Sequence, residues 1–119
     1  MTIKVYRIDP VAKPRMTQSD KWKKRPATTK YWAFKDKVEE LGITLSSSGS
    51  HVTFHVPVPK SWSKKKQKEF IGQPHIQRPD VDNYVKSLMD AIYEDESHIW
   101  DIRITKVWSR VGMITIEEK

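Results

Sequence analysis

Apolar and polar residues alternate along four short stretches of the chain, a pattern typical of half-buried β-strands. The stretches are residues 3–8, 52–58, 99–108 and a last strand that follows a turn near residues 110–112. One side of each stretch is apolar and is therefore predicted to face the core. Those positions are Ile3, Val5, Ile8, Val52, Phe54, Val56, Val58, Trp100, Ile102, Ile104, Trp108, Ile114 and Ile116.

The first predicted helix covers residues 30–41, where apolar residues recur every three or four positions. Thr28 or Thr29 is expected to cap its start, and Gly42 is expected to end it. Before this helix, residues 9–29 are rich in Pro, Lys, Ser and Thr without a sustained period. That composition predicts a long basic loop.

Two more helices are predicted in the second half of the chain. A short lysine-rich helix is expected over residues 64–71, with Ser63 as its cap. A central helix is expected to begin at Pro79 or Asp80, and residues 46–50 indicate a turn. The predicted apolar face of the central helix consists of Val85, Leu88, Met89 and Ile92. Trp62, Trp100 and Trp108 are expected in the core or in a subunit interface.

Composition limits the class of protein. The chain has 119 residues, 37% of them hydrophobic, and no internal repeat, so one globular domain over residues 1–119 is expected. No apolar run approaches the roughly 18 residues of a membrane span, and the N-terminus lacks the apolar segment of a signal peptide. We therefore expect no membrane contact and a mature protein that begins at Met1. The absence of cysteine excludes disulfides and thiolate zinc sites and fits a cytoplasmic protein.

The net charge of +7 points to a polyanionic partner, because Lys and Arg bind nucleic acid by releasing condensed counterions. The alternative is a merely soluble basic protein. The cations gather in two blocks, in the loop 9–29 and around residues 60–68, on either side of an acidic region over residues 80–101. Such an arrangement is typical of a phosphate-binding surface around a metal site. The candidate DNA-binding residues are Lys13, Arg15, Lys23, Lys24, Arg25, Lys64, Lys65, Lys66 and Arg78.

Carboxylates among these cations would repel phosphate unless a divalent cation lies between them. Asp80 and Asp82 come at the start of the central helix, with Lys86 one turn beyond Asp82. Carboxylates around Mg²⁺ suit phosphodiester hydrolysis, and a lysine beside them would stabilise the transition state. The alternative is an ordinary helix start, with Asp at the favourable dipole end and an Asp–Lys ion pair.

A second acidic group, residues 94–96, follows the central helix at its far end. These acids join Asp80 and Asp82 only if the chain folds them together or if another subunit supplies them. The sequence does not choose between these arrangements. His51, His55 and His75 lack metal-ligand spacing, and His98 is expected to be a surface or DNA-contacting residue rather than a general base.

The motifs resemble those of the RusA family of Holliday junction resolvases. They are Pro-Asp-Val-Asp-Asn at 79–83, Lys86, Met-Asp-Ala-Ile at 89–92 and Asp-Glu-Ser-His-Ile at 95–99. Upstream, Lys-Pro-Arg at 13–15 and the segment 56–65 resemble segments of phage and prophage members. The similarity runs over most of the chain in order and spacing.

The resemblance implies a homodimeric, Mg²⁺-dependent endonuclease, with Mn²⁺ as a possible substitute and no small-molecule cofactor, that nicks four-way DNA junctions symmetrically. It implies a small α+β domain with a mixed sheet packed by helices, in a cytoplasmic protein encoded by a bacterium, phage or prophage. By resemblance, Asp80 and Asp82 are metal ligands and Lys86 is the essential lysine. Asn83 is expected to hold a carboxylate in place through a hydrogen bond, and the alternative is that it merely serves the start of the helix.

The third acid of the family aligns with Glu96, where Glu replaces Asp and His98 replaces Gln. Glu96 is the expected third ligand, with Asp95 as the alternative. This departure also supports a competing hypothesis, a junction-binding protein that kept the fold and lost turnover. A structural basic protein without junction preference is a third hypothesis, distinguished by equal affinity for junction and linear duplex.

Overall fold

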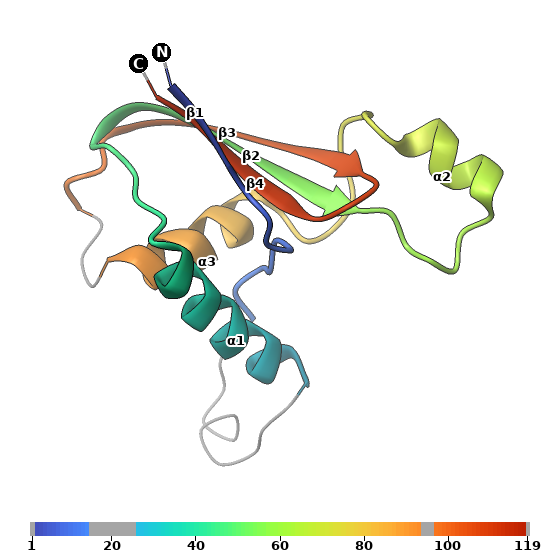
Figure 1. Ribbon diagram of the computed structural model, residues 1–119, viewed down its shortest axis with the longest axis horizontal. Coiled ribbons are helices and arrows are strands. Elements are labelled where there is room, and N and C mark those ends of the chain that lie inside the picture. The colour runs from blue at the N-terminus through green and yellow to red at the C-terminus, as the bar shows by residue number, and fades with distance from the viewer. Residues whose placement is uncertain (1, 15–25, 94–96, 119) are drawn as a thin grey trace.

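Four strands form one mixed sheet in the order β1-β4-β2-β3 (Figure 1). The strands are β1 Thr2–Tyr6, β2 Ser48–Pro57, β3 Asp101–Ser109 and β4 Met113–Glu118. β2 and β3 run parallel, whereas β4 is antiparallel to both β1 and β2. This computed structural model describes residues 2–14, 26–93 and 97–118. The mixed α+β architecture that the sequence predicts is confirmed.

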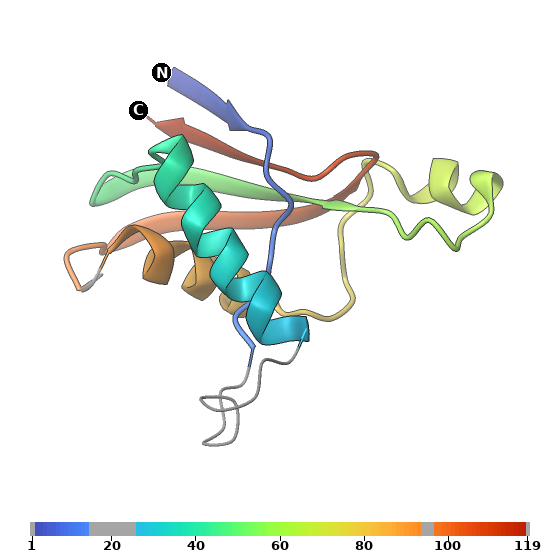
Figure 2. The ribbon, with the colours of Figure 1, turned by 60° about the horizontal axis from the view of Figure 1, so that its bottom comes forward.

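Helices α1 (Pro26–Leu41) and α3 (Val81–Ile92) pack against each other and cover one face of the sheet (Figure 2). The core lies between them and the strands. Its fully buried side chains come from the two central strands and from both helices: Val52, Phe54, Ile114, Ile116, Val38 and Leu88. None of the helices in the described ranges is long and apolar enough to cross a membrane.

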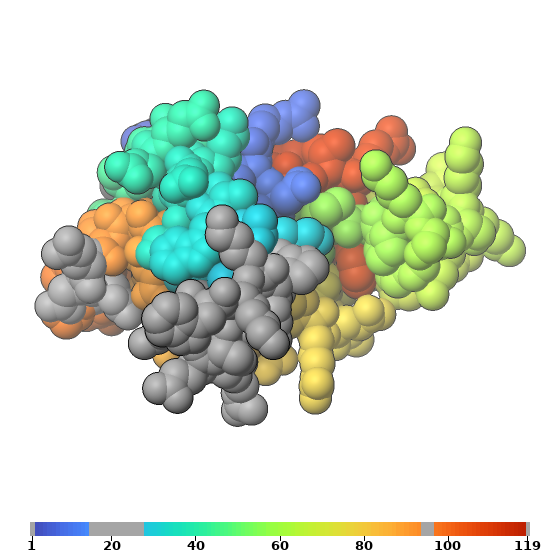
Figure 3. All heavy atoms as spheres, turned by 90° about the horizontal axis from the view of Figure 1, so that it is seen from below, coloured from blue at the N-terminus to red at the C-terminus, as the bar shows by residue number. Residues whose placement is uncertain are grey.

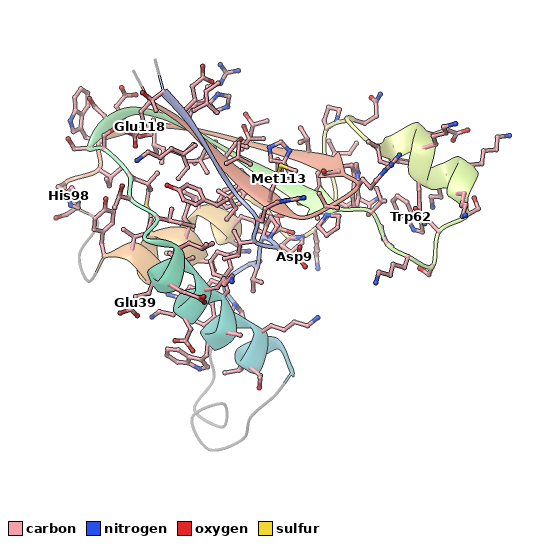
Figure 4. All side chains as sticks on the ribbon, in the orientation of Figure 1. Asp9, Glu39, Trp62, His98, Met113 and Glu118 are labelled. Atoms are coloured by element: carbon pink, nitrogen blue, oxygen red, sulfur yellow. The ribbon has the colours of Figure 1, made fainter. Side chains whose placement is uncertain are left out.

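The third helix, α2 (Lys64–Phe70), projects from the end of the sheet and buries none of its own residues (Figure 1). It is held by an aromatic cluster at its base. The centre of the Trp62 ring lies 5.0 Å from that of Phe70 and 5.1 Å from that of Trp108 of β3. The His75 ring is tilted against Trp108, with ring centres 4.3 Å apart. Trp62, labelled in Figure 4, thus joins the projecting helix to the sheet. Trp108 is buried as expected, whereas Trp62 is only partly buried.

The first strand differs from its prediction. It covers residues 2–6, and Ile3 and Val5, expected to be buried, are 61% and 57% exposed. They pair with Glu117 and Thr115 on the sheet face opposite the helices, which no described helix covers. The alternation of apolar and polar residues predicted the strand correctly, but it did not show which face of the sheet the helices cover. Ile8 is buried as expected, beyond the end of the strand.

Two further boundaries were wrong. β2 begins at Ser48, inside the predicted turn 46–50, and Trp100 lies before β3 and is 76% exposed rather than buried. The sheet requires the longer β2, because its first residues pair with the start of β3 in a parallel register. Ile114 and Ile116 are buried as predicted.

Helix α1 begins at Pro26 rather than at residue 30, so Thr28 and Thr29 lie inside the helix and do not cap it. Proline suits the first turn of a helix, where its missing N–H has no partner to lose. Gly42 ends the helix with a positive φ of 65°, as the sequence predicted. The start of α2 is also confirmed, because the Ser63 side chain accepts a hydrogen bond from the Lys66 backbone N–H.

Candidate active site

The motif Asp80–Lys86 lies at the N-terminal end of α3. Asp80 is the N-cap residue and has an extended backbone, and Asp82 lies in the first turn. The Asp80 carbonyl accepts the N–H groups of Asn83 and Tyr84, at 3.1 and 3.4 Å, which begins the helix. Tyr84 is buried and stacks on Phe54 of β2, so the core fixes the first turn of the helix. Both carboxylates are exposed at the point where the positive end of the helix dipole faces solvent.

Neither Asp80 nor Asp82 makes the local interaction that its position in the helix allows. The Asp80 side chain makes no capping hydrogen bond. Asp82 and Lys86, both exposed, do not form the ion pair that their spacing allows, and the described residues provide no other ion-pair partner for either. The alternative of a capped helix with an ordinary Asp–Lys pair therefore has no support in this geometry. The two carboxylates and the ammonium group remain available for a ligand.

Two free carboxylates suit Mg²⁺, which is usually held by one or two protein carboxylates together with waters and substrate phosphates. The donor set at the start of α3 therefore fits this ion. Within residues 2–14, 26–93 and 97–118, no group of three His, Asp or Glu side chains is close enough together to hold a metal. Asp95 and Glu96, the predicted third ligands, lie outside the described residues.

The length of α3 separates the two acidic groups along the chain. Twelve residues of α-helix rise about 18 Å. Tyr93 and Ser97, which flank the second acidic group, both follow the C-terminal end of α3, whereas Asp80 and Asp82 lie at its start (Figure 1). The exposed His98 packs edge-on against the Tyr93 ring at 4.7 Å, and so it also lies at the far end of the helix from Asp82.

A groove of about 910 Å³ opens beside the motif. Its lining includes Pro79 and Tyr84, which flank the Asp80–Asn83 segment in sequence. The floor is apolar, and three exposed cations line it: Arg7, Lys30 and Lys37. Figure 3 shows this side of the molecule, with helix α1 in cyan, the segment before α3 in yellow and helix α2 in green. These three cations were not among the predicted DNA-binding residues, because they lie far apart in the chain and only the fold brings them together.

The turn between β3 and β4 forms part of the lining of this groove. Asp9, labelled in Figure 4, lies against Gly112 of that turn. A Cβ atom at Gly112 would overlap the Asp9 side chain and backbone, so a larger residue there would displace the segment that carries Arg7. The groove therefore depends on a close approach between two segments that are far apart in sequence.

Lys13 has a defined partner within the chain. Its Nζ donates to Asp90 Oδ2 at 2.6 Å, and Tyr31 of α1 donates its hydroxyl to the same oxygen at 3.3 Å. Burial, assisted by the Asp90 charge and this hydrogen bond, raises the pKa of Tyr31 to about 12, so its hydroxyl keeps its proton. A second bond joins the Lys13 backbone N–H to the Asn83 carbonyl at 3.0 Å. The predicted DNA contact of Lys13 would therefore compete with this ion pair.

The other predicted DNA-binding residues fall into three groups. Lys64 and Lys65 are exposed on α2 and Arg78 is exposed just before the motif, with no ion-pair partner among the described residues. Lys66 lies over the Trp62 ring, with Nζ 4.2 Å from the ring centre. Four more predicted residues lie outside the described ranges: Arg15, Lys23, Lys24 and Arg25.

Comparison with known proteins adds two findings. The family described as endodeoxyribonuclease RusA matches residues 7–118, which is nearly the whole chain. An uncharacterised protein of Bacillus subtilis, YqaN, is 39% identical over 73 residues, which cover 55% of this chain and 51% of that protein. The chain thus spans about half the length of this curated relative.

Proposed function

Since this chain belongs to the RusA endodeoxyribonuclease family, we propose that it is a Mg²⁺-dependent endonuclease that nicks four-way DNA junctions. The observation that supports this most is the exposed Asp80–Asp82 pair at the start of α3. The pair has no capping or ion-pair role among the described residues and lies beside a groove lined with cations. A binding protein without turnover has no evident use for two carboxylates at this place, because they repel phosphate.

In the proposed mechanism, Asp80 and Asp82 hold Mg²⁺, which would polarise the phosphoryl group and lower the pKa of the attacking water. Lys86 lies one turn beyond Asp82 and would stabilise the negative charge that develops on the phosphate. Asn83 would hold one carboxylate in place through its side-chain amide. The α3 N-terminus adds a favourable partial positive charge for the substrate phosphate.

The DNA is proposed to pass through the groove beside the motif, with its phosphates on Arg7, Lys30 and Lys37. The exposed lysines of α2 extend this basic surface away from the groove, and Arg78 lies directly before the metal ligands. Arg15, Lys23, Lys24 and Arg25 lie outside the described residues and remain predicted DNA contacts. Phosphate contacts of this kind position the substrate and carry no sequence information.

We further propose that the protein acts as a homodimer in which each subunit supplies part of the partner's metal site. A metal ion binds oxygen ligands at about 2.0–2.6 Å, whereas α3 places about 18 Å between its two ends. A two-fold axis near the middle of α3 would bring the start of one α3 to the end of the other. Glu96, or Asp95, of the partner subunit would then complete the site. Two such sites match the symmetric paired nicks expected of the family.

The function is tested with a labelled mobile four-way junction and a linear duplex of the same sequence, each incubated with the protein and Mg²⁺. We expect paired nicks on the junction and tighter binding of the junction than of the duplex at the same salt concentration. Tight junction binding without nicks, even with Mn²⁺, would instead support the non-catalytic alternative. Equal affinity for both substrates would contradict a junction-specific protein.

A further inference from the structure

The segment between α2 and α3, residues 71–80, runs along the free edge of β3. The Gly72 N–H donates to the Trp108 carbonyl at 2.9 Å, and the Trp108 N–H donates to the Gln73 carbonyl at 2.9 Å. The His75 N–H then donates to the Lys106 carbonyl at 3.1 Å. The first half of the segment is thus hydrogen-bonded as a short extra strand on β3, which fixes its path toward α3.

Beyond His75 the backbone pairing stops, and the Lys106 side chain replaces it. Lys106 Nζ donates to the Gln77 carbonyl at 2.6 Å and to the Pro79 carbonyl at 2.7 Å. Hydrogen bonds from an ammonium group are shorter and stronger than neutral ones. Pro79 directly precedes Asp80, so Lys106 holds the peptide group that leads into the proposed metal ligand.

We propose that Lys106 is a positioning residue for the metal site. From the edge strand β3, Lys106 fixes the backbone that carries Asp80, so that the Asp80 carboxylate is presented together with Asp82. The exposed Asp80 side chain has no capping bond to orient it, so its direction depends on the backbone before it. Metal ligands need such support, since loss of a supporting residue typically lowers metal affinity about 10- to 100-fold.

This inference rests on the proposed function for its link to metal binding, but the hydrogen bonds themselves are tested separately. In Lys106→Met the ammonium group is lost while most of the side-chain volume remains. Amide hydrogen exchange of residues 78–84 should then become faster than in the wild type, whether or not the protein is a nuclease. Unchanged exchange in this segment would overturn the proposed support, even if cleavage were impaired.

The link to the site is tested by titrating Mg²⁺ in the junction cleavage assay and, without DNA, by measuring Mn²⁺ binding by calorimetry. Lys106→Met should raise the metal concentration for half-maximal cleavage at least about tenfold and weaken Mn²⁺ binding similarly. Junction affinity without metal should stay within about twofold of the wild type. Lys4→Met, on an exposed edge-strand lysine, is the matched control and should change none of these quantities.

The following outcomes distinguish a positioning role of Lys106 from other roles, such as a DNA contact. An unchanged metal requirement with weaker junction binding would make Lys106 a DNA contact and overturn the proposal. If Lys106→Met does not fold, Lys106→Gln keeps one donor and removes the charge, and the same shift in metal requirement is expected from it. A wild-type protein that does not cleave junctions would contradict the proposed function, while the exchange and Mn²⁺ measurements would still test the role of Lys106.

Discussion

Asp80 and Asp82 are unusual at the residue scale because they occupy favourable helix positions without using them. An N-cap aspartate normally accepts a backbone N–H, and an aspartate four residues before a lysine normally pairs with it. In this protein the cap bond and the pair are both absent within the described residues. Removing these carboxylates should therefore cost little folding stability, which makes their function separable from the fold.

We predict that Asp80→Asn and Asp82→Asn each abolish junction cleavage and leave the urea unfolding midpoint nearly unchanged. Junction affinity should be retained or raised, because a charge that repels phosphate is removed. Cleavage assays and gel-shift assays on the same preparations measure the predicted loss of cleavage and the predicted junction affinity. Asp36→Asn, an exposed aspartate on α1, serves as the control. Cleavage by both site variants at the wild-type rate would remove these residues from the active site.

Lys86 is expected to act on the reaction rather than on binding. Lys86→Met should lower kcat about 100-fold through lost electrostatic stabilisation, with little change in junction affinity. Single-turnover cleavage at saturating protein measures the first quantity, and a binding titration without metal measures the second. A loss confined to affinity would make Lys86 a phosphate-positioning contact instead.

His75 links the aromatic cluster to pH-dependent stability. Burial, with a smaller contribution from the Lys106 charge, lowers the pKa of His75, which is 3% exposed. Its neutral form is therefore favoured in the folded protein, while the unfolded chain takes up a proton near pH 6.5. The difference between the pKa values of His75 in the unfolded and folded states contributes to the free energy of unfolding. This contribution is complete above about pH 6.5 and declines as the pH falls toward the lowered pKa of the folded state.

Urea unfolding at pH 7.5 and 5.5 checks this expectation. The free energy of unfolding should fall with acidification, and His75→Gln should show a smaller fall. His98→Gln, at an exposed position, is the control and should keep the wild-type dependence. Equal falls in His75→Gln and the wild type would show that His75 is not the group responsible.

The residue types of the site could be predicted from sequence, but their surroundings could not. Asp80, Asp82 and Lys86 are close in sequence, so one helix start was enough to bring them together. Lys106 contacts the Pro79 carbonyl, and Arg7 lines the same groove as Pro79, only because distant segments of the chain fold together. No local spacing signals such contacts, so these residues were missed.

At the scale of elements, α2 is the clearest case of a helix that serves a surface rather than the core. It buries none of its residues, and the aromatic rings of Trp62, Phe70 and Trp108 attach it to β3. The helix, which carries exposed lysines, projects away from the sheet (Figure 1). This arrangement suits a projecting arm that contacts DNA phosphates.

We predict that Lys64→Ala with Lys65→Ala weakens junction binding and lowers the slope of log affinity against log salt by about 2. The cleavage rate at saturating protein should be preserved, because the metal site is untouched. Lys4→Ala is the control. A preserved salt slope would show that α2 does not contact phosphate.

The sequence predicted the existence of all seven helices and strands found in the described residues but misplaced several of their boundaries. Capping signals worked where they were local, as at Ser63 and Gly42. They failed at α1, where Pro26 opens the helix and Thr28 is buried inside it. The exposed Ile3 and Val5 were misassigned because alternation alone does not show which face of a sheet the helices will cover.

At the scale of the whole molecule, the 12-residue length of α3 is the basis of the proposal that two subunits share each metal site. If the third carboxylate comes from the partner subunit, two inactive variants should restore each other in a mixed dimer. We propose mixing Asp82→Asn with the double variant Asp95→Asn, Glu96→Gln. In the mixed dimer, one site would then combine Asp82→Asn with Asp95→Asn and Glu96→Gln. The other site would contain none of these substitutions.

Random exchange makes half of the dimers mixed, each with one intact site, so nicking should recover to about a quarter of the wild-type level. Each variant alone should remain inactive under the same conditions. No recovery after confirmed subunit exchange would place all of the ligands within one subunit. Size-exclusion chromatography with light scattering tests whether the protein is a dimer, and a monomeric mass would contradict the shared site.

The central claim is that Asp80 and Asp82 hold the Mg²⁺ that drives junction cleavage. Its most direct test is a supercoiled plasmid with an extruded cruciform, incubated with Mg²⁺ and either the wild type or Asp82→Asn. Paired nicks across the junction convert this plasmid to linear DNA, whereas unpaired nicks give open circles. We predict linear product for the wild type and uncut plasmid for Asp82→Asn, although both bind the cruciform. Linear product from Asp82→Asn, or none from the wild type, would contradict the account.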